Sequence, residues 1–147
     1  MNIIIDANIV FSAVLNADGQ IGDLLINSNM FTFIAPNFLR HEIHSHYDKL
    51  MKLSQLPLSS IQEAEYHVCR TIAFMSENTV LPLNWRFAVN LVSDIDVKDT
   101  VYVAFAKQFG GLLWTGDKRL IRGLLGKGFR KVITTDALFA LRESLNK

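Results

Sequence analysis

Short, continuous runs of apolar residues alternate along the chain with longer segments whose apolar residues recur at helical spacing. The runs are too short and too apolar for half-exposed strands, and they predict buried strands of a parallel sheet. We expect strands at residues 3–5, 31–35, 80–83, 112–114 and 131–134, of which 80–83 is edge-like because it contains Pro82. Helices are expected at residues 9–15, 21–27, 36–50, 60–75, 85–92, 98–109, 118–125 and 136–145. This alternation of strands and helices predicts an α/β fold.

The prediction of a functional site starts from the stretch between residues 96 and 120. An amphipathic helix ends at Gly110-Gly111 and is followed by the apolar strand 112–114 and by a turn that contains Asp117. Helix and strand run antiparallel in a βαβ unit, so Asp99 at the start of the helix and Asp117 after the strand should lie at the same end of the sheet. Ligands bind in the crevice beyond the carboxyl ends of such strands.

Strand 3–5 ends in the same manner, at Asp6, with Asn8 two residues later.

Helix capping is a simpler interpretation of every one of these acids. Asp is among the commonest residues at helix N-caps, and Asp6, Asp96, Asp99 and Asp117 all stand where a helix is expected to begin. Taken singly, each acid is more readily explained as a cap.

The middle of the chain predicts a helical hairpin at about residues 37–77, outside the sheet. Its first helix carries Glu42 among three histidines, but the H-E-x-x-H zinc motif fails because position 45 is Ser45. Zinc is therefore a weak alternative, and the histidines are expected at the surface or facing RNA. Its second helix is expected to begin with a capping box formed by Ser60 and Glu63.

Length and composition limit the possible functions. A chain of 147 residues, half of them apolar, predicts one domain over residues 1–147 with a substantial core. The N-terminus has no basic lead and Asp6 interrupts its apolar run, so we expect a cytoplasmic protein without a membrane span. The single cysteine, Cys69, is expected to pack inside a helix.

The net charge of +1 does not by itself indicate a nucleic-acid partner. The charges are unevenly distributed, however. Residues 118–131 hold six basic side chains and no acid, namely Lys118, Arg119, Arg122, Lys127, Arg130 and Lys131. Such a segment is more often a solvated face, but beside an acidic metal site it would suit a phosphate backbone.

Four acids from separate segments, Asp6, Glu42, Asp99 and Asp117, could converge at one crevice. Clustered carboxylates raise one another's pKa unless a cation lies among them. Hard oxygen ligands favour Mg²⁺ or Mn²⁺, and such an ion can activate water and stabilise charge on a phosphodiester.

Four blocks of sequence resemble the PIN-domain nucleases, including the VapC-type toxins. They are I-I-D-A-N, P-N-F-L-R-H-E-I, D-V-K-D-T-V-Y-V-A-F-A and L-L-W-T-G-D-K-R-L, in that order along nearly the whole chain. The resemblance implies a three-layer α/β/α sandwich with a mostly parallel sheet, and metal-dependent cleavage of RNA. It assigns Asp6, Glu42, Asp99 and Asp117 to the family's acidic quartet. It gives Asn8 and Thr115 an orienting role and makes Asp96 an accessory acid, whereas residues 43–83 carry no family motif.

The leading hypothesis is therefore a Mg²⁺- or Mn²⁺-dependent endoribonuclease, the toxin of a toxin–antitoxin pair, with RNA contacts at Lys118, Arg119 and Arg122. The alternative is a PIN-fold protein that binds or processes RNA outside such pairs with little catalysis. A phosphoacceptor domain ranks last, because Lys131 begins the last expected strand instead of ending it. Apolar content and aromatic residues on the outer helices also predict a homodimer, the residues being Phe38, Tyr47, Tyr66 and Phe74.

Overall fold

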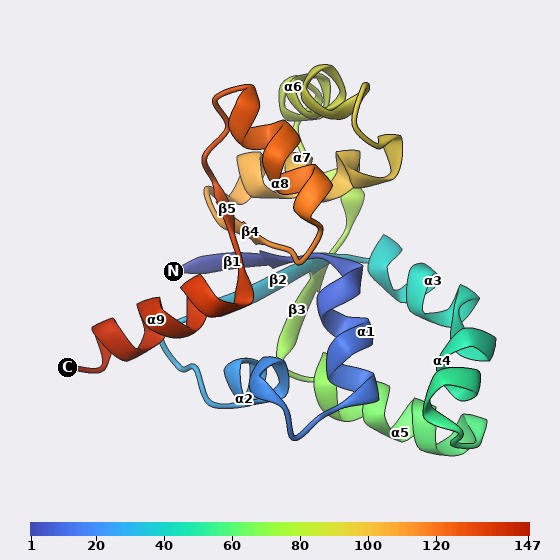
Figure 1. Cartoon of the computed structure of the whole chain (residues 1–147). Coiled ribbons are helices and arrows are strands. Elements are labelled where there is room, and N and C mark those ends of the chain that lie inside the picture. Colours follow the sequence, from blue (N-terminus) through green and yellow to red (C-terminus); the bar gives the residue numbers. More distant parts are fainter.

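A sheet of five parallel strands forms the centre of the computed structural model, which describes all residues from 1 to 147 (Figure 1). The strands are β1 (Asn2–Ile5), β2 (Thr32–Pro36), β3 (Ile72–Met75), β4 (Leu112–Trp114) and β5 (Val132–Ile133). Their order is β3-β2-β1-β4-β5, so the predicted first strand is central and pairs with both β2 and β4. The chain winds outward from β1 in one direction and then returns to the other side of β1 with β4. The switch point of the topology thus lies between β1 and β4.

Helices cover both faces of the sheet and complete three layers. They are α1 (Ala7–Leu15), α2 (Gln20–Ile26), α3 (Phe38–Ser45), α4 (Tyr47–Ser54), α5 (Leu58–Cys69), α6 (Pro82–Val92), α7 (Thr100–Phe109), α8 (Lys118–Gly126) and α9 (Thr135–Leu145). Helices α6, α7 and α8 lie above the sheet in Figure 1, and α1, α2, α5 and α9 lie below it, with α3 and α4 beside α1. The expected α/β/α sandwich is confirmed. No single helix has the length and apolar character to cross a membrane, whereas α1 and α2 together pass that test as a pair bent by 107°.

The core is built where the sequence places its continuous apolar runs. Ile3, Ile4 and Ile5 of β1 are fully buried, as is Trp114 at the end of β4. Helix α7 packs against β1, β2 and β4, and its residues from Val101 to Ala106 are all buried. Parallel strands covered on both faces require this kind of apolar sequence.

Two glycines end α7 as predicted, each for a different reason. Gly110 adopts φ +62°, a left-handed conformation that favours glycine at a helix C-terminus. A Cβ atom on Gly111 would lie only 2.8 Å from the carbonyl oxygen of Asn2, so the chain can enter β4 beside β1 only without a side chain there. This pair therefore sets the position of β4 at the centre of the sheet.

The predictions for residues 36–83 differ most from the structure. Pro36 ends β2 instead of starting a helix, and the helix expected up to residue 50 is broken at His46 into α3 and α4. Helix α5 begins at Leu58 without a side-chain cap, so the capping box of Ser60 and Glu63 does not form. The segment 37–77 holds three helices and a strand where we expected a hairpin of two long helices.

The predicted position of the edge strand, residues 80–83, is also wrong. Ile72–Met75, expected in a helix, forms β3 and pairs in parallel with β2. Residues 80–83, expected as a strand, instead lead into α6, with Pro82 in its first turn. Proline suits this position because the first helical N–H groups need no partner inside the helix.

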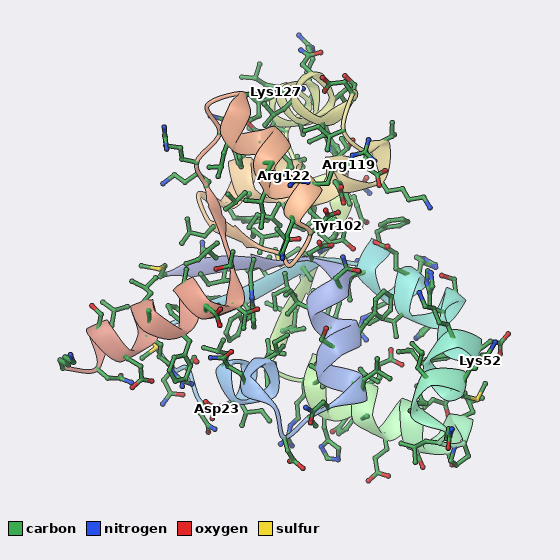
Figure 2. The ribbon with its side chains drawn as sticks, in the orientation of Figure 1. Asp23, Lys52, Tyr102, Arg119, Arg122 and Lys127 are labelled. Carbon is green, nitrogen blue, oxygen red and sulfur yellow. The ribbon has the colours of Figure 1, made fainter.

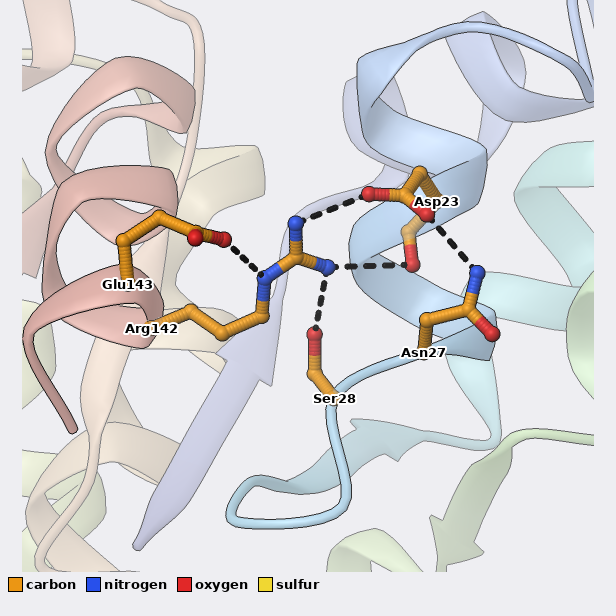
Figure 3. Close-up of polar contacts among 5 residues, drawn as sticks. All are labelled: Asp23, Asn27, Ser28, Arg142 and Glu143. Carbon is orange, nitrogen blue, oxygen red and sulfur yellow. Dashed lines mark hydrogen bonds and ion pairs between the residues drawn. The ribbon is translucent and has the colours of Figure 1, made fainter. Parts of the chain in front are cut away.

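A buried arginine fastens the last helix to the second (Figure 3). Arg142 of α9 is 6% exposed, and its Nη2 donates to Asp23 Oδ2 at 2.8 Å. Its other nitrogens donate to Ser28 Oγ and the Asp23 carbonyl, and to Glu143. Hydrogen bonds from Asn27 first, and then from Arg142, lower the pKa of Asp23. The guanidinium is therefore satisfied on every nitrogen although it is buried.

We expect Arg142→Ala to lower the free energy of unfolding by about 2 kcal/mol, because it removes charge-assisted hydrogen bonds and buried packing together. Chemical denaturation measures the change. Arg86→Ala on α6 is the matched control, since Arg86 is exposed and forms no ion pair, and it should alter stability by about 0.5 kcal/mol at most. Equal losses in the two variants would show that the buried contacts contribute nothing particular to stability.

Candidate active site

The switch point between β1 and β4 brings the first and last predicted site segments together. Ile5 pairs with Trp114, and the Asp6 amide donates to the Trp114 carbonyl at 3.1 Å. Directly beyond, the fully buried Thr115 donates from Oγ1 to Asp6 Oδ2 at 2.7 Å. The same hydroxyl accepts the Asp117 amide at 3.1 Å. Thr115 thus links Asp6 to the turn that carries Asp117.

Asp99 is the last residue of a short 3₁₀ turn, η2 (Val97–Asp99), directly before α7, and it is 9% exposed. Its Oδ2 is the only buried side-chain polar atom of the chain that has no hydrogen-bond partner. Burial first, and nearby negative charges second, raise the pKa of Asp99 from 3.8 to about 7. Those charges belong, in order of effect, to Asp6, Asp96, Asp117 and Glu42.

Asp6 has a similar environment. It is 4% exposed, and burial is the main cause of a raised pKa, partly offset by the hydrogen bond from Thr115. The charges of Glu42 and Asp117 raise it further. The charges of Glu42 and Asp117 therefore act on both buried carboxylates, Asp6 and Asp99.

Glu42 reaches this region from α3 and is held there by a residue that the sequence analysis overlooked. Tyr102 of α7 is 2% exposed, and its hydroxyl donates to Glu42 Oε1. Burial first and this carboxylate second raise the pKa of Tyr102 far above the ordinary range. Tyr102 follows Asp99 by three residues, a spacing that places two side chains on the same helix face. A polar hydroxyl within the apolar run V-Y-V-A-F-A was the available signal.

The capping interpretation explains two of the acids and not the other two. Asp96 Oδ1 accepts the Lys98 amide at 3.0 Å, and Asp117 Oδ1 accepts the Leu120 amide at 3.1 Å, so both are true caps. Asp6 and Asp99 also stand at N-cap positions, but neither side chain makes a capping hydrogen bond. These two buried carboxylates therefore need another explanation.

The predicted histidine alternative does not produce a site. His44 contacts Glu65 at 3.0 Å, and His46 Nδ1 lies 2.7 Å from the Glu42 carbonyl oxygen. No group of three or more His, Cys, Asp or Glu side chains is arranged closely enough to hold a metal ion as the side chains stand. The carboxylate oxygens are nonetheless hard donors of the type that Mg²⁺ and Mn²⁺ prefer, and the unpartnered Asp99 Oδ2 fits such a cation.

The remaining predicted residues lie around the acids. Asn8 is exposed and lines a groove together with Glu42 and Lys98. Lys118, Arg119 and Arg122 are exposed on α8, which begins directly after Asp117, and Figure 2 labels the two arginines on that helix.

Lys127, farther along the same basic segment, has another role. Its Nζ pairs with Asp94 and donates to the Leu91 carbonyl, so it joins the end of α8 to α6. Cys69, as expected, is buried, and burial raises the pKa of its thiol to about 11.

A sequence model of the PIN domain family matches residues 4–136. The crystal structure of PAE2754 from Pyrobaculum aerophilum is 13% identical, with a TM-score of 0.68 over 98% of this chain and 90% of that one. VapBC2 from Rickettsia felis, bound to a DNA fragment from its promoter, is 12% identical, with a TM-score of 0.67 over 91% and 97% of the two chains. No curated protein sequence matches this chain. At these identities the two structures show a shared fold.

We expect folding stability without divalent ions to fall as pH rises from about 3.8 to about 7, because the folded chain keeps a proton on Asp99 that the unfolded chain has lost. At about 1.4 kcal/mol per pKa unit, the loss is on the order of 4 kcal/mol. Asp99→Asn removes this titration, so in chelator at pH 8 the variant should melt at a higher temperature than the wild type. Melting curves at several pH values measure both effects.

Thr134→Ala provides the capping control, because Thr134 Oγ1 accepts the Ala137 amide at the start of α9 and carries no charge. Losing that cap should lower stability by about 1 kcal/mol at every pH. If Asp99→Asn behaved like Thr134→Ala, with a lower melting temperature at both acidic and alkaline pH, Asp99 would be an ordinary capping residue.

Proposed function

Because this chain belongs to the PIN domain family, we propose that it is a metal-dependent endoribonuclease that hydrolyses RNA phosphodiester bonds. PIN domains are generally nucleases. The observation that carries the proposal is the unpartnered oxygen of Asp99, buried at the topological switch point among the charges of Asp6, Glu42 and Asp117. A buried carboxylate of this kind is costly unless a cation or a proton compensates it.

In this proposal Asp6 and Asp99 are the principal ligands of Mg²⁺ or Mn²⁺. Glu42 and Asp117 act through water or on a second ion. The bound ion would supply an activated water and stabilise charge on the phosphate. Thr115 and Tyr102 hold the carboxylates of Asp6 and Glu42 in place by direct hydrogen bonds.

The supporting residues have separate roles. Asp96 is an accessory acid that shapes the start of η2, since its side chain caps that turn. Asn8 belongs to the rim, where it lines the groove beside Glu42. Lys118, Arg119 and Arg122 bind the RNA backbone, because they are exposed and lie on the helix that follows Asp117.

We further propose that the protein is the toxin of a toxin–antitoxin pair. The support is the fold that it shares with VapBC2, which is bound to a DNA fragment from its promoter. The alternative function is RNA binding or processing with little catalysis. It is consistent with the finding that no three His, Cys, Asp or Glu side chains stand close enough together to hold a metal ion. An RNA cleavage assay separates the two.

The homodimer stays a prediction, with less support than the sequence suggested. Of the four outer aromatics, Phe38 and Tyr66 are exposed. Tyr47 donates its hydroxyl to Glu65, and Phe74 lies beneath the guanidinium of Arg40 at 3.8 Å. Two of the four thus have partners within the chain.

Asp6→Asn and Asp99→Asn are each expected to abolish RNA cleavage while the fold persists, because an amide is a poor ligand for a hard cation and carries no charge. The assay uses a panel of single-stranded and structured RNAs with Mg²⁺, Mn²⁺ or chelator. Asp18→Asn is the matched control, since Asp18 is exposed between α1 and α2 and should leave cleavage unchanged. Turnover at the wild-type rate in either site variant, or in chelator, would contradict the proposal.

Tyr102→Phe is expected to reduce cleavage about 10- to 100-fold, because it releases Glu42 from its hydrogen bond without removing a candidate ligand. A higher Mn²⁺ concentration should restore part of the rate, since the lost hydrogen bond acts through the geometry of the metal site. Tyr66→Phe, on the exposed face of α5, is the control. A Tyr102→Phe enzyme with unchanged rate and metal dependence would remove Tyr102 from the site.

A further inference from the structure

A pocket of about 380 Å³ opens beside the acids, between α3, α6 and η2. Aromatic rings line it from two elements: Phe38 and His41 come from α3, and Trp85 comes from α6. Lys98 of η2 and Thr100, the first residue of α7, also line it. Phe38 is 38% exposed although it is large and apolar, so its ring is available to a ligand.

The pocket adjoins the groove that contains Glu42, because Lys98 lines both. His41 immediately precedes Glu42 in α3, while Lys98 and Thr100 flank Asp99. Lys98 also lines the neighbouring groove that contains Asn8 and Glu42. A nucleic acid strand with one phosphate at the acids therefore has this pocket within reach of the adjoining nucleotide.

The chemistry of the lining suits a flat heterocycle better than a phosphate. Lys98 is its only lysine or arginine, and phosphate sites normally combine several cations or amides. Stacking on aromatic side chains is the usual way in which proteins hold unpaired bases. Glu77 adds a carboxylate to the lining, fixed by the hydrogen bond that its Oε1 accepts from the Phe38 amide at 2.7 Å.

We propose that this pocket binds the unpaired nucleobase next to the scissile phosphate, an inference that rests on the ribonuclease function proposed above. The base stacks between the α3 rings and Trp85, and Lys98 contacts the backbone phosphate at the mouth. The second oxygen of Glu77 accepts from an exocyclic amino group, as carboxylates accept from cytosine. The pocket therefore prefers adenine, cytosine or guanine to uracil, which has no amino group.

The experiment first maps the cut that the wild-type enzyme makes in a single-stranded RNA. Binding is then measured with the Asp99→Asn variant, which leaves the RNA intact, by following tryptophan fluorescence. The chain has two tryptophans, and Trp114 is fully buried, so a change on binding reports on Trp85. Three oligonucleotides are compared, in which the nucleotide flanking the cut is unchanged, abasic or uridine.

We expect the unchanged RNA to quench the fluorescence and the abasic RNA to quench it little, with about tenfold weaker binding of the abasic and uridine forms. Adding Phe38→Ala should weaken binding of the unchanged RNA about tenfold and leave binding of the abasic RNA as it was. Tyr66→Ala is the matched control, because Tyr66 is an exposed aromatic on α5, outside this pocket, and it should change neither. Trp85→Phe should abolish the quenching.

Equal binding of the unchanged and abasic RNAs by a protein whose wild type does cleave RNA would overturn the base pocket and leave the ribonuclease proposal standing. Binding of the unchanged RNA by the Phe38→Ala variant without any loss of affinity, and with full quenching, would overturn the base pocket as well. Absence of cleavage by the wild type with every RNA and metal would instead remove the proposed function on which the pocket depends.

Discussion

The burial of like charges at the junction of β1 and β4 is the constraint on which the rest of the site depends. Asp6 and Asp99 are nearly inaccessible to solvent, and burial together with neighbouring acids raises the pKa of each. A fold tolerates such an arrangement only when a proton, a cation or hydrogen bonds offset it. Thr115 supplies a hydrogen bond to Asp6, whereas Asp99 Oδ2 has none. The uncompensated oxygen therefore identifies the point at which a ligand would be most stabilising.

Much of the fold on either side of this point could be predicted because local and global signals agree there. The run Ile3–Ile5 is buried on both faces, and the glycine pair after α7 leads directly into β4. Strand ends followed by acids then place Asp6 and Asp117 at one edge of the sheet by topology alone. The convergence of Asp99 and Glu42 with them followed from helix direction and from the family resemblance, because no local pattern encodes a contact between distant segments.

The errors cluster between β2 and α6, where local signals are ambiguous. The four residues of β3 are a short apolar run continuous with the pattern of α5, and periodicity cannot separate a buried strand from a helix end at that length. Pro82 fits an edge strand and a helix start equally well, and tertiary pairing of β3 with β2 decided between them. Tyr102 was overlooked for a related reason, since its partner Glu42 lies 60 residues away.

We propose that the buried acids form one divalent-cation site. Anomalous scattering from a crystal soaked in Mn²⁺ tests it most directly, because it locates the ion without reference to activity. We expect a peak within coordination distance of carboxylate oxygens of Asp99 and Asp6, with Asp99 Oδ2 among the ligands. A peak elsewhere, or none at these carboxylates when the site is accessible and Mn²⁺ is in excess, would contradict the account.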